Sequence, residues 1–275
     1  MIELGQHHYG KQSIRLVKVV RGTGGHVVRD LTIGISLDGA FDRAYTAGDN
    51  SAVVATDTMK NTVYALAKDR LSGSIEAFGL AVAEELLAAP SVERATVELA
   101  EHPWTRLRPG EDAFRRDGEM RRTARVSVTA AGPMVRAGVA DLVLMKTGKS
   151  AFSGFPRDRF TTLPETEDRI MATRLTGDWR YSGAVDHEAS FASVLETLLD
   201  VFAVHASRSV QETIWILGRA ILERHDEVDE VHLSLPNLHH WLVDLERFGL
   251  ENDAEIFVAT SEPFGSIEAT VRRGD

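Results

Sequence analysis

The sequence contains no cysteine, which excludes disulfide bonds, thiolate metal ligands and a cysteine nucleophile. It has no apolar run long enough to cross a membrane, and its first residues, Met1 to Leu4, lack the pattern of a signal peptide. An excess of positive charge is missing as well: the formal net charge is -10, which argues against nucleic acid or an anionic membrane as a partner. These absences predict a soluble, cytoplasmic protein.

Several common catalytic motifs are also missing. The chain has no glycine-rich loop opening a helix, no Walker lysine loop, no G-x-S-x-G turn and no H-E-x-x-H helix. Its ten histidines are scattered, and the adjacent pairs His7-His8 and His239-His240 would point to opposite faces of a strand, so we predict no metal site. A small anionic substrate is compatible with the acidic chain, since a few basic side chains can dominate the field inside one pocket.

The composition that is present belongs to a globular protein: 275 residues, 43% hydrophobic and 26% charged. Alternating and helical patterns predict that each half of the chain runs strand, strand, helix, helix, strand, strand. We expect antiparallel sheets with helices on one face, the α+β class, whose open sheet edges favour pairing with further copies of the chain. The boundary is expected in a loop at 130–138, which divides residues 1–133 from residues 134–275.

The helices carry the clearest signals. Ser72 or Ser74 is expected to start a helix with an apolar stripe from Ile75 to Leu86. Ser209 is expected to start another helix, in which Glu212 completes a capping box and the apolar stripe consists of Val210, Ile214, Leu217 and Ile221. The remaining expected elements are helices at 61–66 and 189–205 and strands at 13–20, 26–37, 92–99, 122–128, 142–145, 228–235, 241–245, 254–259 and 266–271.

The stretch 234–241 separates two alternating runs near the end of the chain. Pro236 cannot donate to a sheet ladder, so the chain changes direction there. Asn237 and His239 lie two residues apart and would share a face in extended geometry. Locally, the pair is explained by turn chemistry and a satisfied buried imidazole; alternatively, both side chains point into one pocket and bind a small polar molecule.

Other polar residues at element ends also have ordinary readings. The pair Thr56-Asp57 fits a helix N-cap, and the free amides of a helix start would also bind an anion. Four more residues have an ordinary structural explanation on local evidence. Lys11 would be a solvated lysine, Arg169 an ion-paired surface group, Gln211 a solvated amide and Phe152 a core residue.

Seven segments that between them contain these residues, given at the end of this paragraph, resemble the signature segments of the urate oxidase (uricase) family. They occur in family order and with fitting lengths between them. The resemblance implies two tandem T-fold units, a homotetramer whose sheets close into a barrel around a tunnel, and active sites shared between two subunits. It also implies oxidation of urate with O2 and water to 5-hydroxyisourate and hydrogen peroxide, without metal or organic cofactor. The matching segments are Tyr9-Gly10-Lys11, Val54-Ala55-Thr56-Asp57 with Lys60-Asn61-Thr62, Phe152-x-Gly154-Phe155-x-Arg157-Asp158, Thr161-Thr162-Leu163, Asp168-Arg169-Ile170, Ser209-Val210-Gln211 and Ser234-Leu235-Pro236-Asn237-x-His239.

The same resemblance implies roles in substrate binding. Phe152 would stack on the flat purine, Arg169 would grip one edge with its bidentate fork, and Gln211 would meet the opposite edge with its amide. The remaining in-plane contacts would come from backbone amides at Thr56-Asp57 and Val210, with Leu163 as an apolar wall.

Roles in catalysis are implied as well. Lys11 and Thr56, contributed by a neighbouring subunit, would work with His239 as a proton relay that removes a proton from urate and later activates water. Asn237 and Thr56 would hold O2, and then water or peroxide, above the ring. A more fully deprotonated purine is a better one-electron donor, which is how the reaction can dispense with a metal.

Departures from the family pattern are modest. Ser153 stands where some members carry an aromatic residue, and the terminal Arg272-Arg273-Gly274-Asp275 lacks a Ser-Lys-Leu peroxisomal address, which favours a bacterial-type cytoplasmic enzyme. Two alternatives stay open. One is another T-fold enzyme acting on a pterin or purine, although many of these use a glutamate anchor and zinc ligated by His or Cys. The other is a catalytically inactive purine-binding or scaffold protein.

Overall fold

The computed structural model describes residues 2–22, 24–260 and 262–274. The chain forms two compact units: unit 1 comprises Met1–Val139 and Arg180–Phe191, and unit 2 comprises Ala140–Trp179 and Ala192–Asp275. Three elements are divided between the units, namely strand β7 (Gly132–Lys146), strand β8 (Met171–Tyr181) and helix α4 (His187–Val204). Within the described ranges, no helix is long and apolar enough to cross a membrane.

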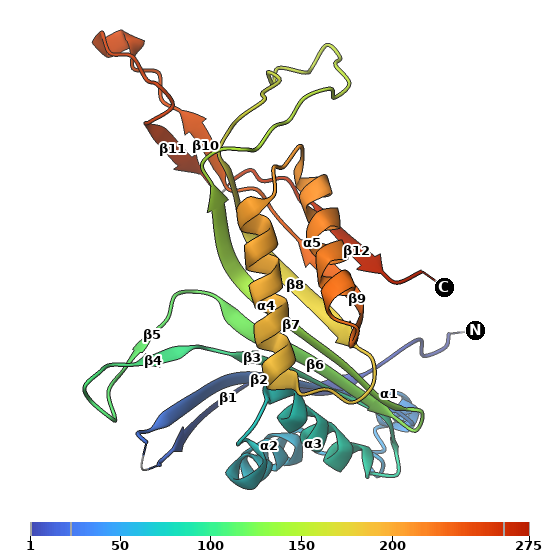
Figure 1. Ribbon diagram of the computed structural model, residues 1–275. Coiled ribbons are helices and arrows are strands. Elements are labelled where there is room, and N and C mark those ends of the chain that lie inside the picture. The colour runs from blue at the N-terminus through green and yellow to red at the C-terminus, as the bar shows by residue number, and fades with distance from the viewer. Residues whose placement is uncertain (1, 23, 261, 275) are drawn as a thin grey trace. The chain divides into compact units, whose positions relative to one another are not determined.

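Unit 1 contains an antiparallel sheet, and helices α2 and α3 pack against its strands (Figure 1). The strands follow the order β1-β2-β3-β6. The elements are β1 (Tyr9–Val20), β2 (Val27–Gly39), α1 (Asp42–Ala47), α2 (Thr56–Arg70), α3 (Ile75–Leu87), β3 (Val92–Glu101), β6 (Arg121–Thr129) and a small hairpin of β4 (Trp104–Arg106) and β5 (Phe114–Arg116).

The core of unit 1 follows from the predicted patterns. Alternate residues of β2 from Leu31 to Leu37 are fully buried, and the apolar stripe of α3 faces the same core. Each such side chain contributes about 1.5–3 kcal/mol on burial. Ser74 is the N-cap of α3, and its hydroxyl accepts a hydrogen bond from Ala77 N at 3.1 Å. Gly79 lets α3 approach the sheet closely, because a Cβ there would lie 2.7 Å from Leu99 Cδ1.

Unit 2 contains a second set of strands in the order β7-β8-β9-β12, and α5 contacts β9 and β12. The apolar stripe predicted for α5 is buried, from Val210 to Ile221. Its Gly218 approaches β12 as closely as Gly79 approaches β3, since a Cβ would lie 2.6 Å from Val271 Cγ2. The elements not yet given are α5 (Val210–Arg224), β9 (Val228–Ser234), β10 (His239–Leu242), the 3-10 turn η1 (Glu246–Phe248), β11 (Phe257–Thr260) and β12 (Glu268–Arg272), and β10 pairs with β11 in a separate two-stranded ribbon.

The element order thus repeats, with β1, β2, α2, α3, β3 and β6 matched by β7, β8, α4, α5, β9 and β12. The α+β class and the antiparallel sheets are confirmed. The expected loop at 130–138 is wrong, because β7 begins at Gly132 and continues to Lys146. The division into units at residue 133 remains a prediction.

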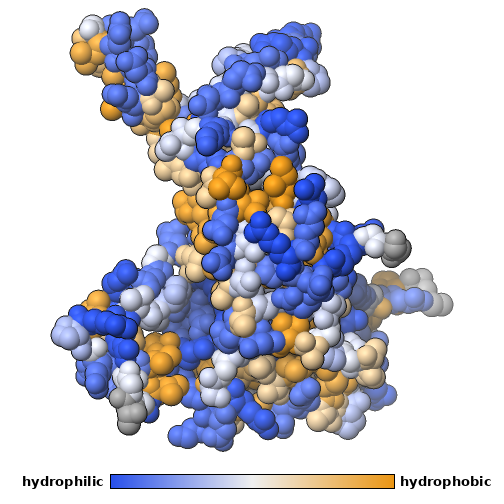
Figure 2. Space-filling view, viewed as in Figure 1, coloured by the Kyte–Doolittle hydropathy of each residue, from blue (hydrophilic) through white to orange (hydrophobic). Residues whose placement is uncertain are grey.

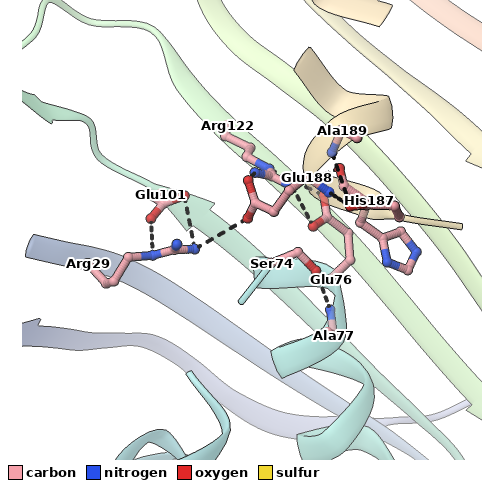
Figure 3. A network of polar contacts seen from close by, with 10 residues as sticks. Arg29, Ser74, Glu76, Ala77, Glu101, Arg122, His187, Glu188 and Ala189 are labelled. Atoms are coloured by element: carbon pink, nitrogen blue, oxygen red, sulfur yellow. Dashed lines mark hydrogen bonds and ion pairs between the residues drawn. The ribbon is translucent and has the colours of Figure 1, made fainter. Parts of the chain in front are cut away.

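A network of buried charges lies inside unit 1 (Figure 3). Glu76, in the first turn of α3, is fully buried, and its Oε2 accepts a hydrogen bond from Arg122 Nη2 at 2.7 Å. Arg122 Nη1 donates to Glu188 Oε2 at 2.7 Å, and Arg29 pairs with Glu101 at 2.6 Å. Burial by itself would lower the pKa of Arg122, but the charges of Glu76 and Glu188 outweigh it and raise that pKa. The printed partners are protein groups, including the backbone carbonyl of His187, which accepts from Arg122 Nη2 at 3.3 Å, so the network acts as structure.

Candidate functional site

Unit 2 contains a cavity of about 820 Å³, within the range of small-molecule binding sites. The walls come from the segment 163–172, the start of α5, the segment 237–242 and strand β11. Seven of the predicted site residues line it: Phe152, Leu163, Arg169, Val210, Gln211, Asn237 and His239.

Phe152 is held at the cavity by its own backbone. Its N–H donates to Thr166 O at 2.8 Å, and Thr166 N–H donates back to Phe152 O at 3.1 Å. The Phe152 ring stacks on Phe155 with centroids 4.9 Å apart and an interplanar angle of 15°. The two hydrogen bonds with Thr166 thereby place Phe152 at the cavity. The alternative that Phe152 is a residue of the apolar core is not what the structure shows.

Arg169 lies against that ring, with its guanidinium carbon 5.2 Å from the centroid of Phe152. Its Nε is buried and has no hydrogen-bond partner among the described residues. Burial lowers the pKa of Arg169, but a guanidinium keeps its charge in proteins. This arrangement suits an anion with acceptors in the plane of the fork.

The N-terminus of α5 forms a second wall. Ser209 is the N-cap, and its hydroxyl accepts a hydrogen bond from Glu212 N at 3.1 Å, as predicted. Val210 and Gln211 occupy the first two helical positions, where amides have no partner within the helix, and both line the cavity. A helix start of this kind donates hydrogen bonds to anions.

The other half of the predicted capping box is wrong. Glu212 does not reach back to Ser209 N; its carboxylate accepts instead from Arg208 N at 2.9 Å and from Arg208 Nε at 2.8 Å. These hydrogen bonds, first of all those from the Arg208 side chain, lower the pKa of Glu212 to about 2.

The segment with Asn237 and His239 is bound to the start of β8 through its backbone. Pro236 O accepts from Thr173 Oγ1 at 2.9 Å, and Leu238 N donates to Ala172 O at 2.8 Å. With the neighbouring backbones fixed, Asn237 and His239 both line the cavity, and so do Leu238 and His240 between and after them. That the two side chains share one face remains a prediction.

Sequence reasoning missed Trp241. Its ring stacks on His239 with centroids 5.2 Å apart and an interplanar angle of 19°, and it lines the same cavity. The signal was present, because Trp241 stands two residues after His239 and therefore on the same face of an extended strand.

Lys11, Thr56 and Asp57 belong to unit 1 and are not among the cavity-lining residues. They form a separate cluster. The Tyr9 hydroxyl accepts from Val54 N at 2.8 Å and donates to Val54 O at 3.1 Å, which ties the start of β1 to the chain just before α2.

Asp57 responds to the charges around it. The pKa of Asp57 is lowered first by a hydrogen bond from Lys60, at 2.5 Å, and by its charge, with a smaller contribution from the charge of Lys11. A bulge follows Lys11 in β1, where Ser13 has a φ of 58°, and bulges of this kind re-aim side chains.

The N-cap predicted at Thr56 is wrong. Ala55 is the N-cap of α2 and makes no side-chain cap, while Thr56 is the first helical residue. The amides of Thr56 and Asp57 therefore lie in the first turn, where a helix has no partner for them. This leaves them as donors for an anion.

Among the residues that the structure describes, no three His, Asp or Glu side chains are grouped closely enough to hold a metal ion.

Comparison with known proteins connects these observations. The family description "Uricase" matches residues 7–127 and 135–268 of the chain. The uricase of Arthrobacter globiformis is 43% identical over 274 residues, covering 99% of this chain and 90% of that protein, and the uricase of Dictyostelium discoideum is 38% identical, covering 99% and 98%. The crystal structure of the Arthrobacter globiformis uricase superposes with a TM-score of 0.95, covering 99% of this chain and 96% of that chain. The chain belongs to the uricase family.

Proposed function

We propose that the cavity of unit 2 binds urate and that the Lys11 cluster of a second copy completes the active site. As a uricase, the chain oxidises urate with O2 and water to 5-hydroxyisourate and hydrogen peroxide. Two electrons leave the purine and reduce O2 to peroxide, and water supplies the new hydroxyl oxygen. The observation that carries the assignment is Arg169, whose charged fork lies over Phe152 with a buried donor left to satisfy.

Urate is a flat anion, and the residues of the cavity match its shape and polarity. Phe152 supplies a stacking face, and Leu163 supplies an apolar wall. Arg169 donates in a bidentate manner to one edge of the ring.

The opposite edge meets α5. The amide side chain of Gln211 both donates and accepts, and the backbone N–H of Val210 donates from the helix start. Thr56 and Asp57 of the second copy add backbone donors from the start of their own helix. These contacts fix the purine in its plane, so that one face is presented to O2.

Proton transfer is assigned to Lys11, Thr56 and His239. Stacking on Trp241 holds the His239 ring at the cavity wall, and an imidazole can both accept and return a proton. With Lys11 and Thr56 of the second copy, it removes a proton from bound urate and later delivers a water molecule in activated form. Asn237, two residues before His239, holds O2 and then water or peroxide above the ring.

A homotetramer is the assembly we propose, because unit 2 exposes hydrophobic side chains on its ribbon (Figure 2). Monomeric proteins rarely leave large apolar patches uncovered. A second copy is the occupant that would also bring Lys11 to the cavity. The side chains of the ribbon, and of the connection between its two strands, that are at least half exposed are Trp241, Leu242, Phe248, Leu250, Ile256 and Val258.

A urate assay on chelator-treated protein tests the chemistry. Loss of urate absorbance, oxygen uptake and peroxide should proceed in equal amounts and at an unchanged rate after chelation. Activity that disappears with the metal would overturn the cofactor-free mechanism, although urate would remain the substrate.

A complementation experiment tests the shared site. Chains carrying Lys11→Met and chains carrying Arg169→Met should each lose most of their activity alone, because each lacks a residue from one half of the site. Co-assembled, they should regain activity, since some sites would combine an intact Lys11 with an intact Arg169. Failure to regain activity in verified mixed oligomers would refute the sharing of the site between copies.

A further inference from the structure

Lys146, at the end of β7, is a buried lysine that the proposed reaction does not use. Its side chain is 9% exposed. The ammonium donates to three backbone carbonyls at the end of α4: Phe202 O at 2.9 Å, Ala203 O at 3.2 Å and His205 O at 2.6 Å. An ammonium has three donors, so each one is satisfied by a carbonyl.

This contact fixes a helix end. The last carbonyls of a helix have no partner within the helix and carry the negative end of its dipole, so a cation placed there is stabilised. Burial, and then the charge of Lys149, lower the pKa of Lys146, and the three carbonyls offset the cost of placing its charge there. The end of α4 is therefore anchored to β7.

The anchored helix end leads directly to the cavity. After α4 ends at Val204, the chain reaches Val210, the first residue of α5, within six positions. In between, Ser207 bridges to the segment before Phe152: Ala151 N donates to Ser207 O at 2.7 Å, and Ser207 N donates to Lys149 O at 2.9 Å.

The same turn is also bound to α5. Thr213 Oγ1 donates to Ser207 Oγ at 2.8 Å, and Ser207 Oγ donates to Ser209 O at 3.0 Å. One short turn therefore connects the segment carrying the stacking ring with the helix start carrying the amide donors.

We infer that Lys146 is a positioning residue for urate binding, which sets the place of the α4–α5 turn and thereby aligns Val210 and Gln211 with Phe152. The inference rests on the proposed function, because it takes Gln211 and Phe152 as contacts of urate. Lys146 touches no substrate; it acts through the turn between the helices.

The chain contains a matched control in unit 1. Lys18, on β1, donates to Ala67 O at 2.8 Å and to Lys68 O at 2.9 Å, at the end of α2. By the repeated element order, β1 corresponds to β7 and α2 to α4. The turn that follows α2 leads to α3, which carries none of the proposed site residues. Lys18 thus performs the same capping chemistry at the end of α2 remote from Thr56 and Asp57, and the turn that it caps leads to no proposed site residue.

The experiment compares Lys146→Met with Lys18→Met. Initial rates at varied urate give KM and kcat, and absorbance titration with urate under anaerobic conditions gives Kd. We expect Lys146→Met to raise both KM and Kd about threefold to tenfold, the value of one misplaced hydrogen bond, while kcat changes by less than about twofold. Lys18→Met should lower thermal stability and leave KM and Kd unchanged. Equal KM and Kd in Lys146→Met and the unaltered protein, or an equal rise in Lys18→Met, would overturn the inference.

Two further variants keep the test decisive. If Lys146→Met does not fold, Thr213→Val breaks the same turn without leaving a gap, and it should raise KM by about twofold; an unchanged KM would count against the inference. Gln211→Ala separates the proposed urate site from the positioning role of Lys146. A normal Kd in Gln211→Ala would defeat the proposed site itself, whereas a raised Kd there with a normal Kd in Lys146→Met would defeat only the positioning role.

Discussion

Arg122 in unit 1 and Arg169 in unit 2 are both arginines withdrawn from water, but their surroundings differ. Arg122 donates to Glu76 and Glu188, and those charges raise its pKa. Arg169 lies over an aromatic ring with its Nε buried and unpartnered among the described residues, and burial lowers its pKa.

The difference separates a structural arginine from a ligand-binding one. A guanidinium whose donors all meet protein acceptors has no hydrogen bonds left for a substrate. One that is desolvated without a carboxylate carries an electrostatic cost that an anionic ligand can relieve. Stability and binding should therefore respond in opposite ways when the two residues are changed.

The largest effect should come from Arg122→Met. It leaves Glu76 buried without its partner, and breaking a buried ion pair costs about 3–5 kcal/mol. Urea denaturation should show the loss. The double variant Arg122→Met with Glu76→Gln should recover part of it, because the carboxylate left without Arg122 would then be Glu188, which is half exposed to water. Full stability in Arg122→Met would show that the network is dispensable.

Arg169→Met should produce the reverse pattern. Removing a bidentate, charge-assisted contact should lower kcat/KM for urate by about a hundredfold. The unfolding midpoint should stay constant or rise slightly, because a buried unpartnered donor is removed. Steady-state kinetics and thermal denaturation on one preparation test both halves; a large loss of stability would instead place Arg169 with Arg122 as a structural residue.

A smaller effect is expected at the two helix caps. Ser74→Ala and Ser209→Ala each remove a hydroxyl that accepts from the third residue of its helix, at a cost of about 1 kcal/mol. Only Ser209→Ala should also raise the KM for urate, because only α5 presents its first turn to the cavity. An equal KM for urate in the two variants would show that the N-cap of α5 does not affect the site.

The smallest effect concerns Glu212. Its pKa in the folded chain is lowered to about 2, so its ionised form stabilises the fold above the ordinary glutamate range, and this contribution is lost as the pH falls toward 2. Because Arg208 is largely exposed, the contribution is a few tenths of a kcal/mol. Glu212→Gln should have a lower urea midpoint than the unaltered protein at neutral pH, and the gap should close on acidification. A gap independent of pH would mean that packing, not charge, stabilises this position.

Local patterns predicted the parts of the fold that depend on neighbouring residues. The stripes and N-cap serines of α3 and α5 follow from spacing along a helix. Strand β8 was missed although alternate residues from Met171 to Trp179 are buried, because threonine and glycine occupy two of these positions and interrupt the apolar signal.

Long-range contacts were out of reach of such patterns. Lys146 and Phe202 are separated by 56 positions, and no spacing rule connects a strand end with a distant helix end. The surroundings of Arg169 were misleading in sequence, because the neighbouring acids do not pair with its buried Nε in three dimensions. The family resemblance singled out the residues that line the cavity, but their mutual geometry required the folded chain.

The ribbon of β10 and β11 is expected to determine how the protein loses activity on warming. It is a two-stranded sheet with His239 at its first residue, and two-stranded hairpins are marginally stable alone. Its amide protons should exchange with deuterium sooner than those of β9, which lies inside a larger sheet. On warming, local opening of the ribbon would displace the imidazole while the helices remain folded. Loss of urate turnover would then precede loss of the far-ultraviolet circular dichroism signal, so that inactivation and unfolding are two separate events in this chain.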